Sequence, residues 1–117
     1  MLILKKKIPI YFGELVVIFN DDFNESLAKY KIDYDAGGCY GLFICAKINN
    51  ETKWIILLKN KTTHSTLAHE VVHCTHRILE EIAHTATFET DEPEAYLHAY
   101  ITREIYKFIK KNNVDII

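Results

Sequence analysis

The sequence contains few of the residues that bend a chain or cross-link it. Its 117 residues include two prolines, four glycines and three cysteines. The cysteines, Cys39, Cys45 and Cys74, are odd in number and lack the C-x-x-C spacing of zinc ribbons and redox dithiols. We therefore expect a reduced protein, which favours a cytoplasmic location.

An excess of positive charge is also missing. Fourteen lysines and arginines stand against sixteen acids, the net charge is -2, and the only basic run is Lys5–Lys7. Nucleic-acid binding requires a clustered basic face, so we expect no nucleic-acid partner. The apolar N-terminal segment is interrupted by Pro9, Gly13 and Glu14. It falls short of the roughly 18 apolar residues of a spanning helix and has no small-residue cleavage site, so we expect neither membrane insertion nor secretion.

The remaining pattern predicts one α+β domain over residues 1–117, long enough to fold without a disulfide or a structural metal. Apolar runs predict three strands, the last two forming a hairpin: Leu15–Phe19, Tyr40–Ala46 and Trp54–Leu58. Helical spacing predicts a short helix from Asp21 to about Tyr30, and long helices from about Ser65 to Ala83 and from about Glu92 to Lys111. The expected N-caps are Asn20 for the first helix and Thr63 or Ser65 for the second.

Residues 69–73, His-Glu-Val-Val-His, match the H-E-x-x-H pattern of zinc hydrolases. Residues four apart in a helix are turned by about 40° and rise about 6 Å, so His69 and His73 present two imidazoles to one point. Such nitrogens suit Zn²⁺. Glu70 is displaced around the helix, where its carboxylate can reach a metal-bound water without binding the metal, and this is the position of a general base. The pattern also occurs by chance, but the hairpin before it and the acidic helix start after it favour a metal site.

A catalytic zinc site has three protein ligands and leaves one position for water. The metzincin extension would place glycine and then histidine after the motif, but Leu79 stands where that histidine falls, which excludes that class. An antiparallel second helix can bring a carboxylate to close the site. The candidates are the acids at the start of the last helix: Asp91, Glu92 and Glu94.

Two blocks, Leu67–His73 and Asp91–Leu97, resemble the compact gluzincin-like metallopeptidases of phage and bacterial genomes, the minigluzincins, which are distantly similar to the ImmA/IrrE type. Glu104–Phe108 and the strand-rich first half extend the resemblance over most of the chain. The resemblance implies a third ligand from a glutamate that is followed by small and aromatic residues. Glu92 fits best, with the following residues on its face: Ala95, Tyr96 and Ala99. Glu94 is the alternative, and its face looks more like core.

Other candidate residues have simpler interpretations. His76 lies about 10 Å along the helix from His69, too far to share its ion, and is expected in polar packing near the site. Cys74 points about 100° away from His73 and is expected to be a buried small residue. Tyr96 and Tyr100 could supply a phenol to a reaction intermediate, although a core role is at least as well supported.

The sequence thus predicts a zincin-like fold, in which a three- or four-stranded, mainly antiparallel sheet packs on the H-E-x-x-H helix and the last helix supplies Glu92. The expected function is zinc-dependent hydrolysis of a peptide or protein substrate, with Glu70 as general base on a zinc-bound water. An edge strand could align the peptide. The alternative is a non-catalytic metal-binding or regulatory module on the same scaffold.

Overall fold

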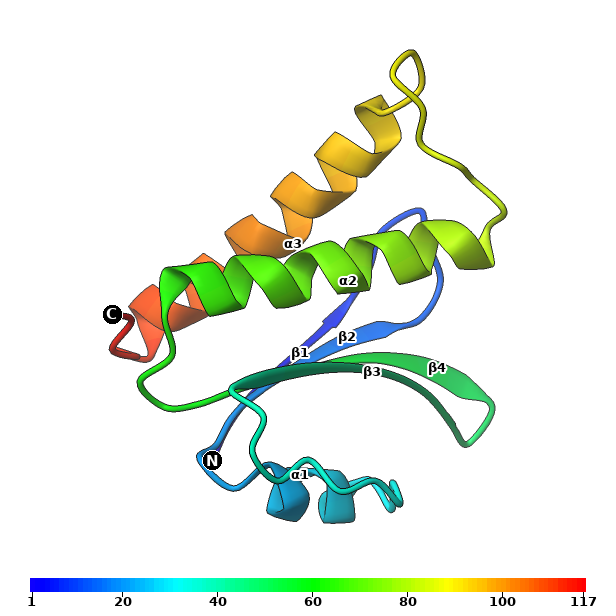
Figure 1. Ribbon diagram of the computed structural model, residues 1–117. Coiled ribbons are helices and arrows are strands. Elements are labelled where there is room, and N and C mark those ends of the chain that lie inside the picture. Colours follow the sequence, from blue (N-terminus) through cyan, green and yellow to red (C-terminus); the bar gives the residue numbers. More distant parts are fainter.

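A computed structural model describes all 117 residues as a four-stranded sheet with helices on both faces (Figure 1). The strands are β1 (Leu2–Lys7), β2 (Glu14–Phe19), β3 (Gly41–Ile48) and β4 (Glu51–Leu58). Their order is β1-β2-β4-β3, with antiparallel outer pairs and a parallel central β2–β4 pair. The predicted α+β class is confirmed, and the sheet is mixed because of that central pair.

The two central strands are buried on both faces. Leu15, Val17 and Phe19 of β2 belong to one apolar cluster, whereas Val16 and Ile18 belong to the other. A strand covered on both sides has a continuous apolar sequence rather than an alternating one. The same holds for Trp54–Leu58 in β4. This double burial is why both strands were predictable from short apolar runs.

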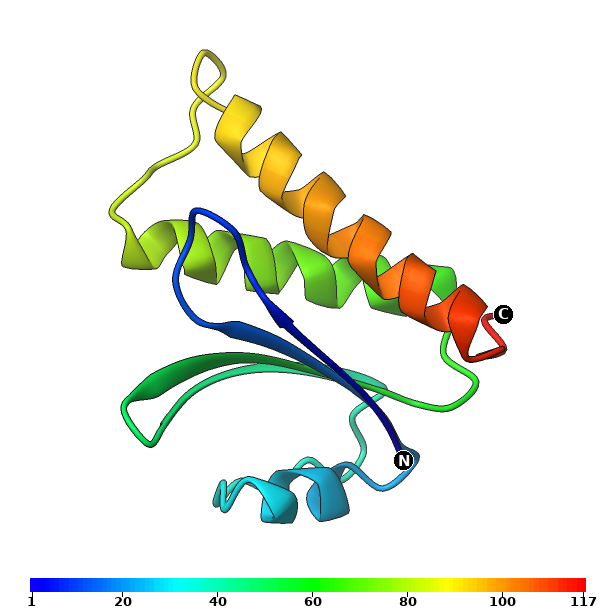
Figure 2. The same cartoon turned by 180° about the vertical axis from the view of Figure 1, so that it is seen from behind.

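Helices α1 (Phe23–Lys29), α2 (His64–Glu81) and α3 (Glu92–Lys111) cover the sheet unequally. α2 and α3 lie on one face and α1 on the other (Figures 1 and 2). The larger cluster lies under α2 and α3 and includes Val71, Ile78 and Ile101. None of the helices combines the length and hydropathy that crossing a lipid bilayer requires.

The predicted N-cap of α2 is confirmed, and that of α1 is wrong. Thr63 accepts a hydrogen bond from the backbone N–H of Thr66. At α1 the cap is Asp22, which accepts from the N–H of Glu25. Asn20 lies two residues earlier, where its Oδ1 accepts from the N–H of Asp22 and shapes the turn that precedes the helix. Both residue types suit caps, so position relative to the first turn decides between them.

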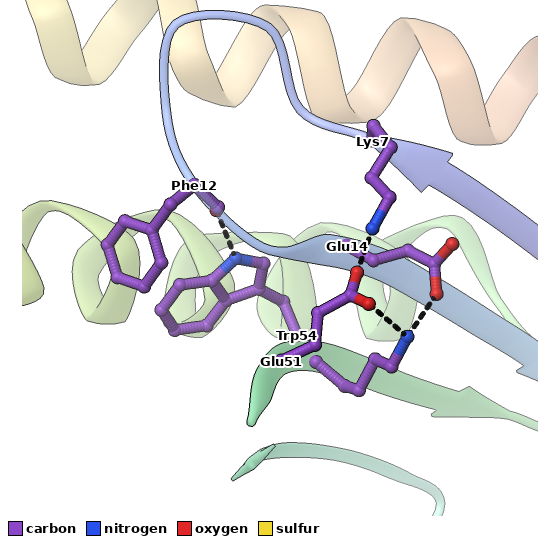
Figure 3. Close-up of polar contacts among 6 residues, drawn as sticks. Lys7, Phe12, Glu14, Glu51 and Trp54 are labelled. Atoms are coloured by element: carbon purple, nitrogen blue, oxygen red, sulfur yellow. Dashed lines mark hydrogen bonds and ion pairs between the residues drawn. The ribbon is translucent and has the colours of Figure 1, made fainter. Parts of the chain in front are cut away.

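Strand β1 was not predicted, because its outer half, Lys5–Lys7, is exposed at the edge of the sheet. The loop that follows it is fastened to β4 at its base (Figure 3). The indole Nε1 of Trp54 donates to the Phe12 carbonyl at 3.0 Å. Lys53 Nζ lies 2.7 Å from Glu14 Oε1 and 3.5 Å from Glu51 Oε2, and Lys7 also pairs with Glu51.

The tip of the same loop has strained backbone. Ile10 has a φ of 73° and is fully exposed. The left-handed region is costly for a β-branched residue. Gly13 has a φ of 88°, and a Cβ there would lie 2.4 Å from Trp54 Nε1, so glycine is required at the base for both conformation and space.

Candidate metal centre

The two histidines of the motif converge on one point above α2. Their Nε2 atoms are 3.1 Å apart, and the ring planes meet at 77°. Two nitrogens bound at about 2.0–2.1 Å to one tetrahedral ion lie roughly 3.3 Å apart. Both side chains are exposed. His69 and His73 are therefore spaced as two ligands of a single ion, in a position open to solvent.

Glu70, between these two residues in sequence, is buried instead, with only 6% of its surface exposed. Its carboxylate lies against the start of β3, where a Cβ on Gly41 would be 3.0 Å from Glu70 Oε2. Burial raises the pKa of the Glu70 carboxyl, and the neighbouring His69 and His73 lower it by less. A carboxylate with a raised pKa is a better proton acceptor near neutral pH, which is the property that a general base needs.

A cavity of about 500 Å³ joins the motif to the edge of the sheet. Its lining comes from two elements, α2 and the first residues of β3, and includes Leu42, Phe43, His69, Glu70 and His73. β3 pairs only with β4, so its other edge is free. The candidate metal ligands and the candidate base thus border the free edge of a strand.

The third ligand is not assembled around the histidine pair, since no group of three His, Cys, Asp or Glu residues is spaced to hold an ion. Glu92, the predicted ligand, is exposed at the first residue of α3. Glu94 is half-buried and its Oε1 contacts His76 Nε2. The two glutamates differ in exposure because they lie on different sides of α3. Glu94 lies three residues before buried Leu97, on the side that faces α2. Glu92 is turned about 140° away from Leu97 around the helix.

His76 lines the same cavity as His69 and His73, so its expected place in polar packing near the site is confirmed. Cys74 is fully buried, as predicted. Of the two central valines of the motif, Val71 is buried and Val72 is 39% exposed.

Tyr96 and Tyr100, the two tyrosines of α3 considered as phenol donors, lie in different surroundings. Tyr96 is 73% exposed, so the core role considered for it is wrong. Tyr100 is half-buried and its hydroxyl is shielded from solvent without a hydrogen-bond partner.

Sequence reasoning missed the contribution of Gly41 and Thr66. A Cβ on Gly41 would lie 2.7 Å from Thr66 Cγ2 as well as close to Glu70, so the absence of a side chain lets β3 approach α2. A glycine within a strand is a known sign of close backbone approach, and Gly41 carried that signal. The signal does not reveal which element approaches, because Thr66 lies 25 residues further along the chain.

Comparisons of the chain with protein-family models, with curated proteins and with solved structures gave no match.

Proposed function

We propose that this protein is a zinc-dependent metallopeptidase in which Glu70 is the general base. The observation that carries the proposal is the 3.1 Å separation of the His69 and His73 Nε2 atoms beside a buried carboxylate. Two exposed imidazoles and one desolvated carboxylate line the same cavity. The H-E-x-x-H motif requires the same arrangement, in which the two histidines bind the ion and the glutamate does not.

The chemistry then follows from the donors. His69 and His73 would hold the ion through Nε2, as neutral imidazoles do. Zinc bound there would supply a Lewis acid that polarises the scissile carbonyl and lowers the pKa of water. Glu70 would accept a proton from the attacking water and pass it to the leaving amine. Its raised pKa serves both transfers, because the carboxyl must gain the proton and then release it.

Glu94 is the third ligand that the geometry supports best. Its carboxylate already contacts His76, one helical turn beyond His73. Glu92 would need the first turn of α3 to rotate before it reached α2, and it stays the prediction from resemblance. Zinc titration of Glu94→Ala and Glu92→Ala separates the two. We expect the first variant to lose affinity sharply and the second to change within a few-fold; the reverse ranking would assign the ligand to Glu92.

The free edge of β3 gives the proposal its substrate class. An extended peptide can add to an uncovered strand edge through main-chain hydrogen bonds. Leu42 and Phe43 of that strand line the cavity that holds the motif. A peptide aligned there would pass in front of His69 and His73, so an unfolded segment is a better substrate than a folded protein.

The deciding experiment measures zinc content and then peptide hydrolysis, with an unfolded protein as substrate. We expect about one zinc per chain, lost in His69→Ala. Glu70→Gln should keep the zinc and the fold but lose activity by at least roughly 10²-fold, because an amide cannot accept the proton. Hydrolysis that persists in purified Glu70→Gln would refute the mechanism.

A second candidate function is a non-catalytic metal-binding module. The observation in its favour is that only two of the three expected ligands lie together. A wild-type protein that binds zinc tightly, hydrolyses no unfolded substrate and is unaffected by Glu70→Gln in any assay would support this candidate.

A further inference from the structure

No other helix or strand lies over the outward side of α3 (Figures 1 and 2). That side carries a stripe of exposed residues. The stripe consists of Glu92, Ala95, Tyr96, Ala99 and Arg103. These residues recur at steps of three and four and therefore share one helical face. The buried residues Leu97, Ile101 and Ile105 define the opposite face. The stripe thus lies opposite the face that holds α3 in the core.

The middle of the stripe is apolar. Tyr96 is 73% exposed between two alanines, whose small side chains would let another backbone come close. Beside it is a cavity of about 370 Å³, lined mainly by apolar residues of α3 and of the loop that carries Ile10. Ile10 itself is fully exposed at the rim of that cavity. Exposed tyrosine and aliphatic side chains gathered in this way are typical of protein interfaces.

The ends of the stripe carry opposite charges. Glu92 lies at the N-terminal end and Arg103 at the C-terminal end, and neither forms an ion pair within the chain. They are 11 residues apart, about 16 Å along the helix. The midpoint between them falls between Leu97 and His98, and the same point is the midpoint between Tyr96 and Ala99. The stripe is therefore complementary to itself when it is turned end for end.

We propose that two copies of this chain associate through an antiparallel, two-fold contact between their α3 helices. In this arrangement Glu92 lies opposite Arg103 of the partner subunit, and Tyr96 packs on Ala99 of the partner subunit. Two-fold symmetry forms each of these contacts twice. With Glu94 as the third ligand, the stripe faces away from α2 and the association does not depend on metal binding.

The test is a concentration series of the 117-residue protein by sedimentation velocity, with wild type, Glu92→Arg and Arg103→Glu. Each reversal turns two attractive pairs into two repulsive ones, so we expect the dimer Kd to rise about tenfold. Lys29→Glu, a reversal of the same sign as Arg103→Glu on α1, lies on the far side of the sheet and should leave the Kd unchanged. Circular dichroism checks that each variant is folded.

Mixing the two single variants tests the register directly. A heterodimer of Glu92→Arg with Arg103→Glu restores both opposite-charge contacts, so the mixture should dimerise as tightly as wild type to within about threefold. The double variant in one chain should also recover. A wild-type protein that stays monomeric overturns the proposal, as does a dimer that ignores both reversals or a mixture that shows no recovery.

Discussion

Replacing Gly41 by alanine tests how closely β3 and α2 must approach for the candidate base to sit where it does. The added Cβ would lie 2.7 Å from Thr66 Cγ2, 3.0 Å from Glu70 Oε2 and 3.1 Å from Glu70 Cγ. Contacts this short cannot be kept, so either β3 moves outward or Glu70 and Thr66 shift. Overpacking of this kind costs about 1–3 kcal/mol. Alanine regains roughly 0.5–1 kcal/mol because it has less freedom than glycine in the unfolded chain.

We therefore expect Gly41→Ala to lower the free energy of unfolding by about 0.5–2 kcal/mol, measured by urea denaturation at an unchanged m-value. Thr66→Ser supplies a matched second substitution, since it removes the methyl at 2.7 Å and keeps the hydroxyl that contacts Thr63 Oγ1. The double variant should recover much of the lost stability.

Activity should respond differently from stability. Thr66→Ser does not relieve the contact with Glu70. Under the proposed function, the double variant should therefore bind zinc like wild type and still hydrolyse peptide more slowly. Equal stability of Gly41→Ala and wild type would show that the β3–α2 approach is looser than described. Failure of Thr66→Ser to rescue would show that the Cγ2 contact is not the cause of the loss.

Two further predictions concern the strained loop and an ion pair on α3. At protein concentrations where the chain is monomeric, Ile10→Gly should raise the free energy of unfolding by up to about 1 kcal/mol, because the left-handed backbone of a fully exposed residue is relieved. Ile10→Val keeps the β-branch, and an equal gain there would contradict this cause. Burial raises the pKa of the Glu104 carboxyl, but hydrogen bonds from Lys107 and Lys6 outweigh burial and leave that pKa below its usual value. The stabilisation of the folded state by this ion pair is complete above about pH 4.3 and is lost as pH falls through the lowered pKa. Glu104→Gln should therefore reduce the loss of the free energy of unfolding at acid pH. An unchanged dependence of that free energy on pH would refute this prediction.

The parts of the fold that were predictable are those with a local signal. Trp54–Leu58 is apolar without a break because it is covered on both faces, and the helical spacing around His69 and His73 needs no knowledge of distant residues. β1 gave no such signal, because an edge strand with Lys5–Lys7 exposed resembles any polar segment. The parallel β2–β4 pairing depends on where α1 and β3 lie in three dimensions, and no local pattern encodes it.

The candidate site was likewise predictable only where its signal is local. Both histidines and Glu70 follow from one helical turn. The choice between Glu92 and Glu94 depends on which side of α3 faces α2, and the buried residues Leu97 and Ile101 settle that orientation in the structure. The small and aromatic residues that favoured Glu92, namely Ala95, Tyr96 and Ala99, face solvent, so the choice of Glu92 stays a prediction.

Because β2 pairs with β4, it must wait during synthesis for a partner strand that is made later. Lys53, the partner of Glu14, is made 39 residues later, and bacterial to eukaryotic synthesis at about 5–20 residues per second takes roughly 2–8 s over that length. During this interval β2 can pair only with β1, and its apolar residues lack the strand and helices that bury them. A holding chaperone would thus be most useful in this interval, when only the N-terminal third of the chain has been made.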